Sequence, residues 1–90
     1  MATKKELTAK LGEFKNVKPL ANNQIVLVYE NGEIFSSYET IIGFKVGYDY
    51  YLTADYKYST TTSKWCNKWL GVDSKTRDKA IKNGVFQMVE

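Results

Sequence analysis

The sequence contains no histidine and only one cysteine, Cys66, among its 90 residues. Histidine acid–base catalysis, Ser-His-Asp or Cys-His triads, and zinc sites built from imidazole and thiolate ligands all need residues that the chain lacks. The phosphate loops G-x-x-x-x-G-K-[ST] and G-x-G-x-x-G are absent too. The carboxylates Asp49 and Asp55 are more typical of turns than of an acid–base pair. We therefore expect a protein that is not an enzyme and that uses no metal and no cofactor.

Long apolar runs are also missing. The longest, I-V-L-V-Y at 25–29, is far shorter than the roughly 18–20 residues that a membrane span requires. The basic N-terminal residues are not followed by an apolar core, so we expect no secretory signal and no membrane partner. A single cysteine cannot form an internal disulfide, which fits a reducing compartment. The expected location is the cytoplasm.

Composition and pattern predict one small α+β domain spanning residues 1–90. The chain has 43% hydrophobic residues, one proline and six glycines, which is a globular composition. The Asn-Gly pair at 31–32, between two β-rich runs, predicts a hairpin. We expect a helix in 1–12, an extended connector at 13–23, a β-meander over 24–58, a helix over 60–71, and a helix and strand in 74–90. The predicted architecture is a four- or five-stranded, mainly antiparallel sheet with two or three short helices packed on one face.

Charge is unevenly distributed along the chain. Residues 1–20 carry a net charge of +3, residues 21–60 carry −3 and residues 61–90 carry +3. This order predicts basic helices and an acidic sheet. Basic helices attract phosphate backbones or acidic protein surfaces, although an excess this small is more often only a solvated surface.

Tyrosine is concentrated in the predicted sheet, where most of the seven tyrosines lie between positions 38 and 58. Strand alternation places Tyr48 and Tyr50 on one face and Tyr51 on the other. We expect Tyr48 and Tyr50 to be ordinary half-buried strand residues. Tyr51, with Tyr56 or Tyr58, is expected on an open face, where exposed tyrosine suits base stacking or a protein interface.

A run of hydroxyl residues, T-T-T-S at 60–63, precedes the second predicted helix. Thr60, Thr61 or Thr62 is expected to be the N-cap, because a side-chain oxygen there accepts hydrogen bonds from the first-turn amides. One cap is enough, so the remaining hydroxyls and Ser63 are candidates for holding an anion at the helix N-terminus. A helix start is the first interpretation of the run, and an anion or partner contact is the second.

The helix that follows carries two kinds of side chain at helical spacing. Trp65 and Trp69 are one turn apart and are expected to belong to the core. Lys64 and Lys68 are also one turn apart and lie together on the flank. Lys64, near the first turn, is mildly unfavourable to the helix dipole, which would suit an anion bound there.

The strings S-S-Y-E-T-I-I-G-F (36–44) and Y-K-Y-S-T-T-T-S-K-W-C-N-K-W-L-G (56–71) resemble an uncharacterised family of small phage and prophage proteins. That family has a hairpin with S-Y-x-T-x-[IV], followed by a [YW]-S-x-T-T-[ST]-[KR]-H helix start. The likeness spans about residues 25–72. Trp65 stands where the family usually has His, and Gly43 where it usually has Ala. A packing role of the His would pass to Trp65, whereas a chemical role would not. The resemblance implies a phage or mobile-element setting in a bacterial host and no particular reaction.

Two functions follow as hypotheses, with a virion assembly role as a third that no feature favours. The first is an inhibitor of a host protein or protein–nucleic-acid complex, such as an anti-CRISPR blocking a Cas nuclease, whose acidic and tyrosine-rich sheet opposes a basic groove. The alternative is an accessory protein that binds nucleic acid through basic helices and exposed tyrosine. A homo-oligomer is compatible with the sequence but is not indicated. The candidate partner- or nucleic-acid-binding residues are Tyr51, Tyr56, Tyr58, Lys57, Lys64, Lys68, Lys75 and Arg77.

Overall fold

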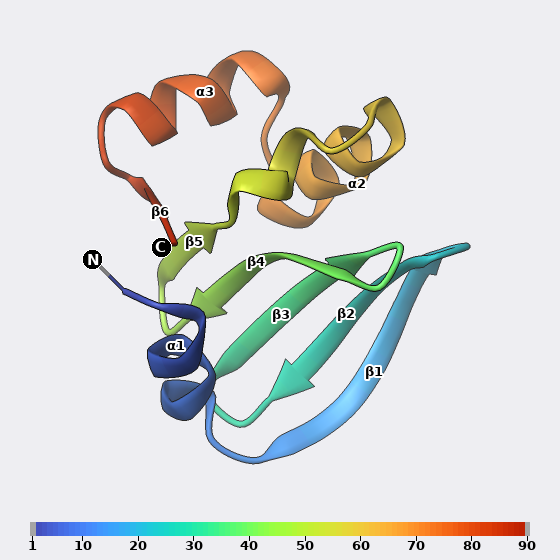
Figure 1. Cartoon of the computed structure of the whole chain (residues 1–90), viewed down its shortest axis with the longest axis vertical. Helices are drawn as coiled ribbons and strands as arrows, with labels where there is room; N and C mark the ends of the chain where they lie inside the picture. The colour runs from blue at the N-terminus through green and yellow to red at the C-terminus, as the bar shows by residue number, and fades with distance from the viewer. Residues whose placement is uncertain (1, 90) are drawn as a thin grey trace.

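A computed structural model of the chain describes residues 2–89 (Figure 1). Six strands form one sheet whose spatial order follows the chain from β1 to β6. All neighbouring strands are antiparallel except β5 and β6, which are parallel. The elements are α1 (Lys4–Leu11), β1 (Phe14–Ala21), β2 (Gln24–Tyr29), β3 (Gly32–Ser37), β4 (Thr40–Val46), β5 (Asp49–Leu52), the 3₁₀ turn η1 (Ala54–Lys57), α2 (Thr60–Leu70), α3 (Ser74–Lys82) and β6 (Phe86–Met88). The expected α+β class is confirmed.

The predicted connector at 13–23 is instead the edge strand β1. β1 pairs with β2 alone, and its first six residues are exposed, so it lacks the alternation that identifies a half-buried strand. Pro19 is unfavourable inside a sheet, but an edge strand tolerates proline on its unpaired side. The strand is therefore specified by its partner β2 and not by its own pattern.

The β2–β3 hairpin forms as expected, but its glycine has a different use. Tyr29 pairs with Gly32, so Glu30 and Asn31 make the turn and Gly32 begins β3. A Cβ on Gly32 would collide with the backbone carbonyl of Lys45 and lie 2.7 Å from Cδ2 of Leu11. Gly32 thus allows α1 and β4 to approach β3 closely.

Helices cover both faces of the sheet, not one face as predicted. Leu7 and Leu11 of α1 pack on Ile34 and Phe44. Cys66 and Leu70 of α2 belong to a second cluster on the other face, where Phe35 lies. Ile34 and Phe35 are neighbours in β3 and point to opposite faces, as strand geometry requires. Both faces are apolar in the centre of the sheet, and each face takes a helix.

A β-bulge in β4 places Gly43 beneath α2. Phe35 pairs with Gly43 and Ser36 with Ile41, so Ile42 is the extra residue. Ile42 joins the cluster under α2, and Gly43 leaves room above the sheet for the indole of Trp69. This strand thereby sets the height at which α2 lies over the sheet.

Two tyrosine expectations are wrong. Tyr48, expected to be half-buried, lies in the β4–β5 turn and is 99% exposed. Tyr51, expected on an open face, packs against the cluster that holds α1. The error has one cause: with helices on both faces, neither face of β5 is open, and the freely exposed tyrosines lie in turns.

Candidate functional site

Helix α2 is capped by Ser59 and not by one of the three threonines that follow. The Ser59 hydroxyl accepts a hydrogen bond from the Thr62 amide at 3.1 Å, and the helix begins at Thr60. At the other end, Gly71 adopts a left-handed conformation with φ 78° and stops the helix, which lies within the predicted range 60–71. The first turn carries no acidic residue, so no carboxylate of that turn competes with an anion at the positive end of the helix dipole.

The remaining hydroxyls of the run have separate tasks. Thr62 is fully buried, and its hydroxyl lies 2.8 Å from that of Ser37 and accepts a hydrogen bond from Ser59. Ser63 faces α3, Thr60 faces a surface hollow, and Thr61 is exposed. The run therefore combines a cap, a tie to the sheet and a polar surface.

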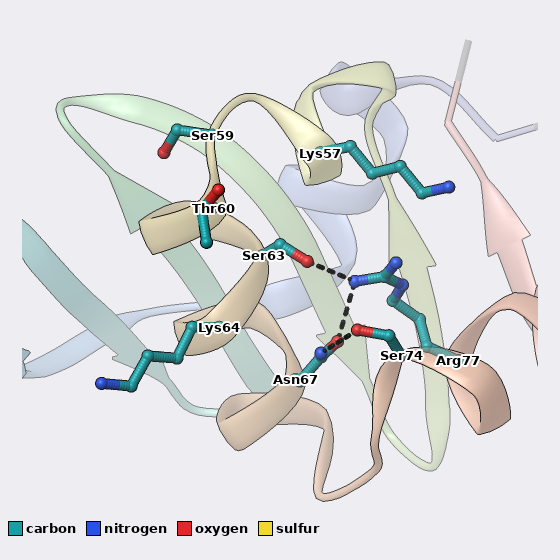
Figure 2. A pocket seen from close by; sticks show the side chains of 8 residues that line it. All are labelled: Lys57, Ser59, Thr60, Ser63, Lys64, Asn67, Ser74 and Arg77. Carbon is teal, nitrogen blue, oxygen red and sulfur yellow. Dashed lines mark hydrogen bonds between the residues drawn. The ribbon is translucent and has the colours of Figure 1, made fainter.

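Arg77 joins the two C-terminal helices from within. The residue is only 2% exposed although it carries a charge. Its Nη1 donates to Ser63 Oγ at 2.7 Å and to Asn67 Oδ1 at 2.9 Å, so one guanidinium nitrogen holds two residues of α2. Asn67 Nδ2 in turn donates to Ser74 Oγ at 2.8 Å. Figure 2 shows this chain of hydrogen bonds spanning the space between α2 and α3.

Above these bonds lies a hollow of about 600 Å³ that is open to solvent, which we call the hydroxyl–arginine pocket. It is lined by side chains of η1, α2, α3 and the segment before α2, and every one of them carries a group that can donate a hydrogen bond. Lys57 and Lys64 extend to opposite sides of the Arg77 guanidinium (Figure 2). The lining residues are Lys57, Ser59, Thr60, Ser63, Lys64, Asn67, Ser74 and Arg77.

The pocket has a positive balance of charge. Three of its eight lining residues are cations, and no lining residue carries a carboxylate. Asp78 lies beside the pocket, where it accepts from Arg77 Nε at 3.1 Å and lies 3.8 Å from Lys57 Nζ. One carboxylate against three cations leaves the site positive, with Lys64 making no ion pair among the described residues.

The N-terminus of α3 closes one side of the pocket. Asp73 caps this helix by accepting a hydrogen bond from the Thr76 amide at 2.7 Å. That hydrogen bond lowers the pKa of the Asp73 carboxyl, so the cap is ionised at neutral pH. The cap fixes the start of α3 and thereby the position of Ser74, whose hydroxyl reaches the pocket.

The structure brings together five of the candidate residues and separates the others. Lys57, Lys64, Arg77, Thr60 and Ser63 line the pocket. Tyr56 packs on the core with its ring 5.1 Å from the Arg77 guanidinium, so it supports the pocket and does not line it. Lys75 and Thr61 are exposed and Thr62 is buried, while Lys68 lies on another flank of α2. Tyr58 is 63% exposed and lies 6.4 Å from the ring of Tyr38.

Three pocket residues were not singled out from the sequence: Ser59, Asn67 and Ser74. A helical signal for Asn67 did exist, because Ser63 and Asn67 are one turn apart on α2 and therefore share a face. Ser74 offered no comparable signal, because its contact depends on how the turn at Gly71 folds α3 back against α2.

The described part of the chain holds no metal cluster and no membrane-spanning helix. Among residues 2–89, no group of three or more His, Cys, Asp or Glu side chains is placed to hold a metal ion. No helix in this range is long and apolar enough to cross a membrane.

Comparison with known proteins identifies a family but no activity. Neither the curated proteins nor the solved structures yield a match to this chain. A family of unknown function, DUF8033, matches residues 5–84, which include the whole hydroxyl–arginine pocket. Membership of an uncharacterised family, as the sequence predicted, is thus confirmed, and the chain belongs to DUF8033.

Proposed function

We propose that the protein acts by binding rather than by catalysis, and that its ligand is the phosphate backbone of nucleic acid. One observation carries the proposal: a buried arginine, Arg77, forms the floor of a pocket rich in hydroxyls and flanked by Lys57 and Lys64. Phosphate oxygens accept hydrogen bonds from lysine and hydroxyl donors, are attracted by the charge of a guanidinium, and favour a helix N-terminus.

The pocket suits phosphate better than it suits a carbon-based substrate. Its lining offers hydroxyl, amide and cationic groups, with no His, Cys, Asp or Glu among them. Such a set can bind an anion but lacks the carboxylate, imidazole and thiol groups that most often transfer protons in catalysis. The open, shallow shape favours a backbone that passes over the surface.

A polymer of phosphates is favoured over a single phosphate because the cations extend beyond the pocket. Lys64 and Lys68 follow one another along the exposed side of α2, one turn apart. A row of lysines binds successive phosphates and releases their counterions, which is the main source of affinity in sequence-independent binding. The resemblance to phage and prophage proteins supports a role as an accessory protein in the cytoplasm of a bacterial host.

The test is fluorescence anisotropy with labelled oligonucleotides over a series of salt concentrations. Lys57→Ala with Lys64→Ala should weaken binding and reduce the slope of log K against log [salt] by about 2, one for each lost phosphate contact. The matched control is Lys5→Ala with Lys10→Ala, which removes the same charge from α1 on the other face of the sheet. The control should retain the slope.

Two results would overturn the proposal. One is the absence of oligonucleotide binding at low salt. The other is an equal loss of affinity in the pocket variant and the α1 control, because that result would mean that net charge alone attracts the ligand.

Inhibition of a host protein is a second candidate, and one observation favours it. Tyr38 and Tyr58 form an exposed aromatic pair beside the start of α2. Exposed aromatic pairs are typical anchors of protein interfaces. The specific form is counter-defence, for example an anti-CRISPR that blocks a Cas nuclease. Phage plating on hosts with and without CRISPR immunity tests this form of the function. If the variant Tyr38→Ala with Tyr58→Ala still protects the phage from immunity, the assignment of the interface to these two residues is wrong.

A further inference from the structure

A second hollow lies between α2 and the sheet, on a different flank of the helix from the hydroxyl–arginine pocket. Its volume is about 350 Å³, and it is more enclosed than the pocket. We call it the aromatic cleft, because three aromatic side chains shape it: Tyr50 from β5 with Trp65 and Trp69 from α2. The other lining residues are Lys18, Leu20, Val26, Glu33, Lys45 and Lys68.

Trp69 forms a rigid wall of the cleft. Its Nε1 donates to Glu33 Oε1 at 3.1 Å, which fixes the orientation of the indole. The ring stacks on Phe35 at 5.6 Å between centroids and meets the ring of Tyr50 edge-on at 5.2 Å. An aromatic wall held on three sides needs no rearrangement to receive a planar ligand, so little free energy is spent on ordering it.

Trp65 presents a ring that already attracts cations. Lys68 Nζ lies 4.7 Å from a Trp65 ring centroid and Lys64 Nζ lies 5.5 Å from one. Both lysines are exposed, so water can replace their ammonium groups at the Trp65 ring. A planar ligand on Trp65 would replace weak cation–π contacts with stacking, and both ammonium groups would become free to pair with nearby phosphates.

Helix geometry connects the two sites. At about 100° per residue, the pocket residues Thr60, Ser63 and Asn67 lie on one flank of α2, and Trp65 and Trp69 lie on another. The exposed lysines Lys64 and Lys68 occupy the ridge between these flanks. A chain that crosses the ridge would therefore meet the pocket on one side, lysines on top and aromatic rings on the other side.

The charge of the cleft selects the kind of planar ligand. Lys18, Lys45 and Lys68 line it against one carboxylate, Glu33, and one oxygen of that carboxylate is engaged by Trp69. A positive aromatic cleft suits an aromatic ring that is linked to an anion. In a duplex the faces of the bases are stacked on one another, so only a single strand offers such a ring freely.

We propose that the aromatic cleft binds one nucleobase of a single-stranded nucleic acid whose backbone crosses α2 into the hydroxyl–arginine pocket. This inference rests on the proposed function and narrows its ligand from nucleic acid in general to single strands. Stacking on one aromatic platform does not depend on base identity, so the cleft accepts DNA and RNA with little sequence preference.

Four ligands of equal length separate the contributions: oligothymidylate, oligouridylate, an abasic oligomer of the same backbone, and a duplex. The two single strands should bind about tenfold more tightly than the abasic oligomer, and should quench tryptophan emission where the abasic oligomer does not. Trp65→Leu should bind the single strands no more tightly than the abasic oligomer. Its affinity for the abasic oligomer should equal that of the wild type. Trp65→Phe, which retains a ring, is the matched control and should keep most of the preference.

The outcomes distinguish the two proposals. If the abasic oligomer and oligothymidylate bind equally, or if the duplex binds as well as the single strands, the cleft proposal is wrong and the phosphate pocket stands. If the single strands bind but the abasic oligomer does not, base stacking is supported and the phosphate pocket is wrong. If nothing binds at low salt, both proposals fail. Quenching in the wild-type protein supplies a readout that does not depend on the variants' stability.

Discussion

Gly43 lies directly beneath the indole of Trp69: a Cβ added to Gly43 would be 2.7 Å from Cζ3 of that ring. Trp69 cannot move away freely, because Glu33 holds its Nε1 and Phe35 stacks on its face. We therefore expect Gly43→Ala to lower the free energy of unfolding by about 1–3 kcal/mol, the usual cost of overpacking.

The control for this change is the same substitution in a Trp69→Phe background. The smaller ring leaves space, so Gly43→Ala should cost less there, and chemical denaturation of the four proteins gives the coupling energy. Equal costs in both backgrounds would show that the clash is with the Tyr51 carbonyl, which lies 3.0 Å from the same Cβ, and not with Trp69.

The three threonines that begin α2 should differ sharply in their effect on stability. Thr62→Val keeps the volume but removes the hydroxyl that meets Ser37, leaving a buried partner without its hydrogen bond. We expect a loss of about 1–3 kcal/mol. Thr60→Ala and Thr61→Ala, which alter exposed side chains, should stay within about 0.5 kcal/mol in urea denaturation. Equal losses at all three positions would contradict this division of tasks.

Arg77 should matter through its shape as well as its charge. Arg77→Met removes the donors to Ser63 and Asn67, and we expect a loss of about 1.5–3 kcal/mol. Arg77→Lys should restore little of it, because an ammonium lacks the planar fork that reaches both partners. Thermal unfolding measures the effect, with Lys75→Met on the exposed side of α3 as control. Full stability of Arg77→Lys would mean that charge alone is needed.

Cys66 should make stability fall at high pH. Burial raises the pKa of its thiol from 9.0 to about 12, although the Arg77 charge lowers it in part. Below pH 9 the thiol is neutral in both the folded and unfolded states, so its contribution is constant. Above pH 9 the unfolded chain loses the proton first, and the free energy of unfolding should fall by up to about 1.4 kcal/mol per pH unit until about pH 12.

Other groups titrate in the same range, so Cys66→Ala is the control. The difference between wild type and this variant should be flat from pH 7 to about 9 and then decline. The native thiol should also react slowly with a disulfide reagent at pH 8, because the thiolate is the reactive form. A rapid reaction in the native state would contradict the burial.

Gln24 is a buried polar residue whose replacement should stabilise the protein. Its side chain is fully buried, and neither its Nε2 nor its Oε1 has a hydrogen-bond partner among residues 2–89. Gln24→Met keeps the length and removes the desolvated amide, so we expect a gain of about 1–3 kcal/mol in denaturant unfolding. Gln87→Met, at an exposed position of β6, should gain nothing. A loss at Gln24 would indicate a partner for the amide in solution.

Strong local signals predicted most of the fold. The helices expected in 1–12 and over 60–71 and the hairpin at the Asn-Gly pair 31–32 all correspond to observed elements. The edge strand β1 and the parallel pairing of β6 escaped prediction, because both depend on a partner strand. The conformation of the β3–β4 turn was also not indicated by the sequence. Tyr38 and Glu39 adopt φ values of 51° and 66°, at which Gly or Asn is the usual residue.

The candidate site was predicted in part for a similar reason. Thr60, Ser63 and Lys64 belong to one turn of a helix, and a helical pattern places them together. The meeting of Arg77 with that turn requires the reversal of the chain between α2 and α3, and no local pattern encodes it. Trp65 and Trp69 do pack against the core, as predicted. The cleft beside them also needs Lys18 of β1 and Lys45 of β4, and no local pattern brings those strands to α2.

The strand order has a consequence for the order of folding. Each strand from β2 to β5 pairs with the strand just before it, so the meander assembles through short loops. The pairing of β5 with β6 instead brings together two strands that are separated in the chain by η1, α2 and α3. This pairing closes the longest loop of the sheet. Both proposed sites draw on α2 and so lie within or against this enclosed segment. A chain shortened before residues Phe86–Met88 is therefore expected to form the meander but to lack the pairing that closes the segment on which both proposed sites depend.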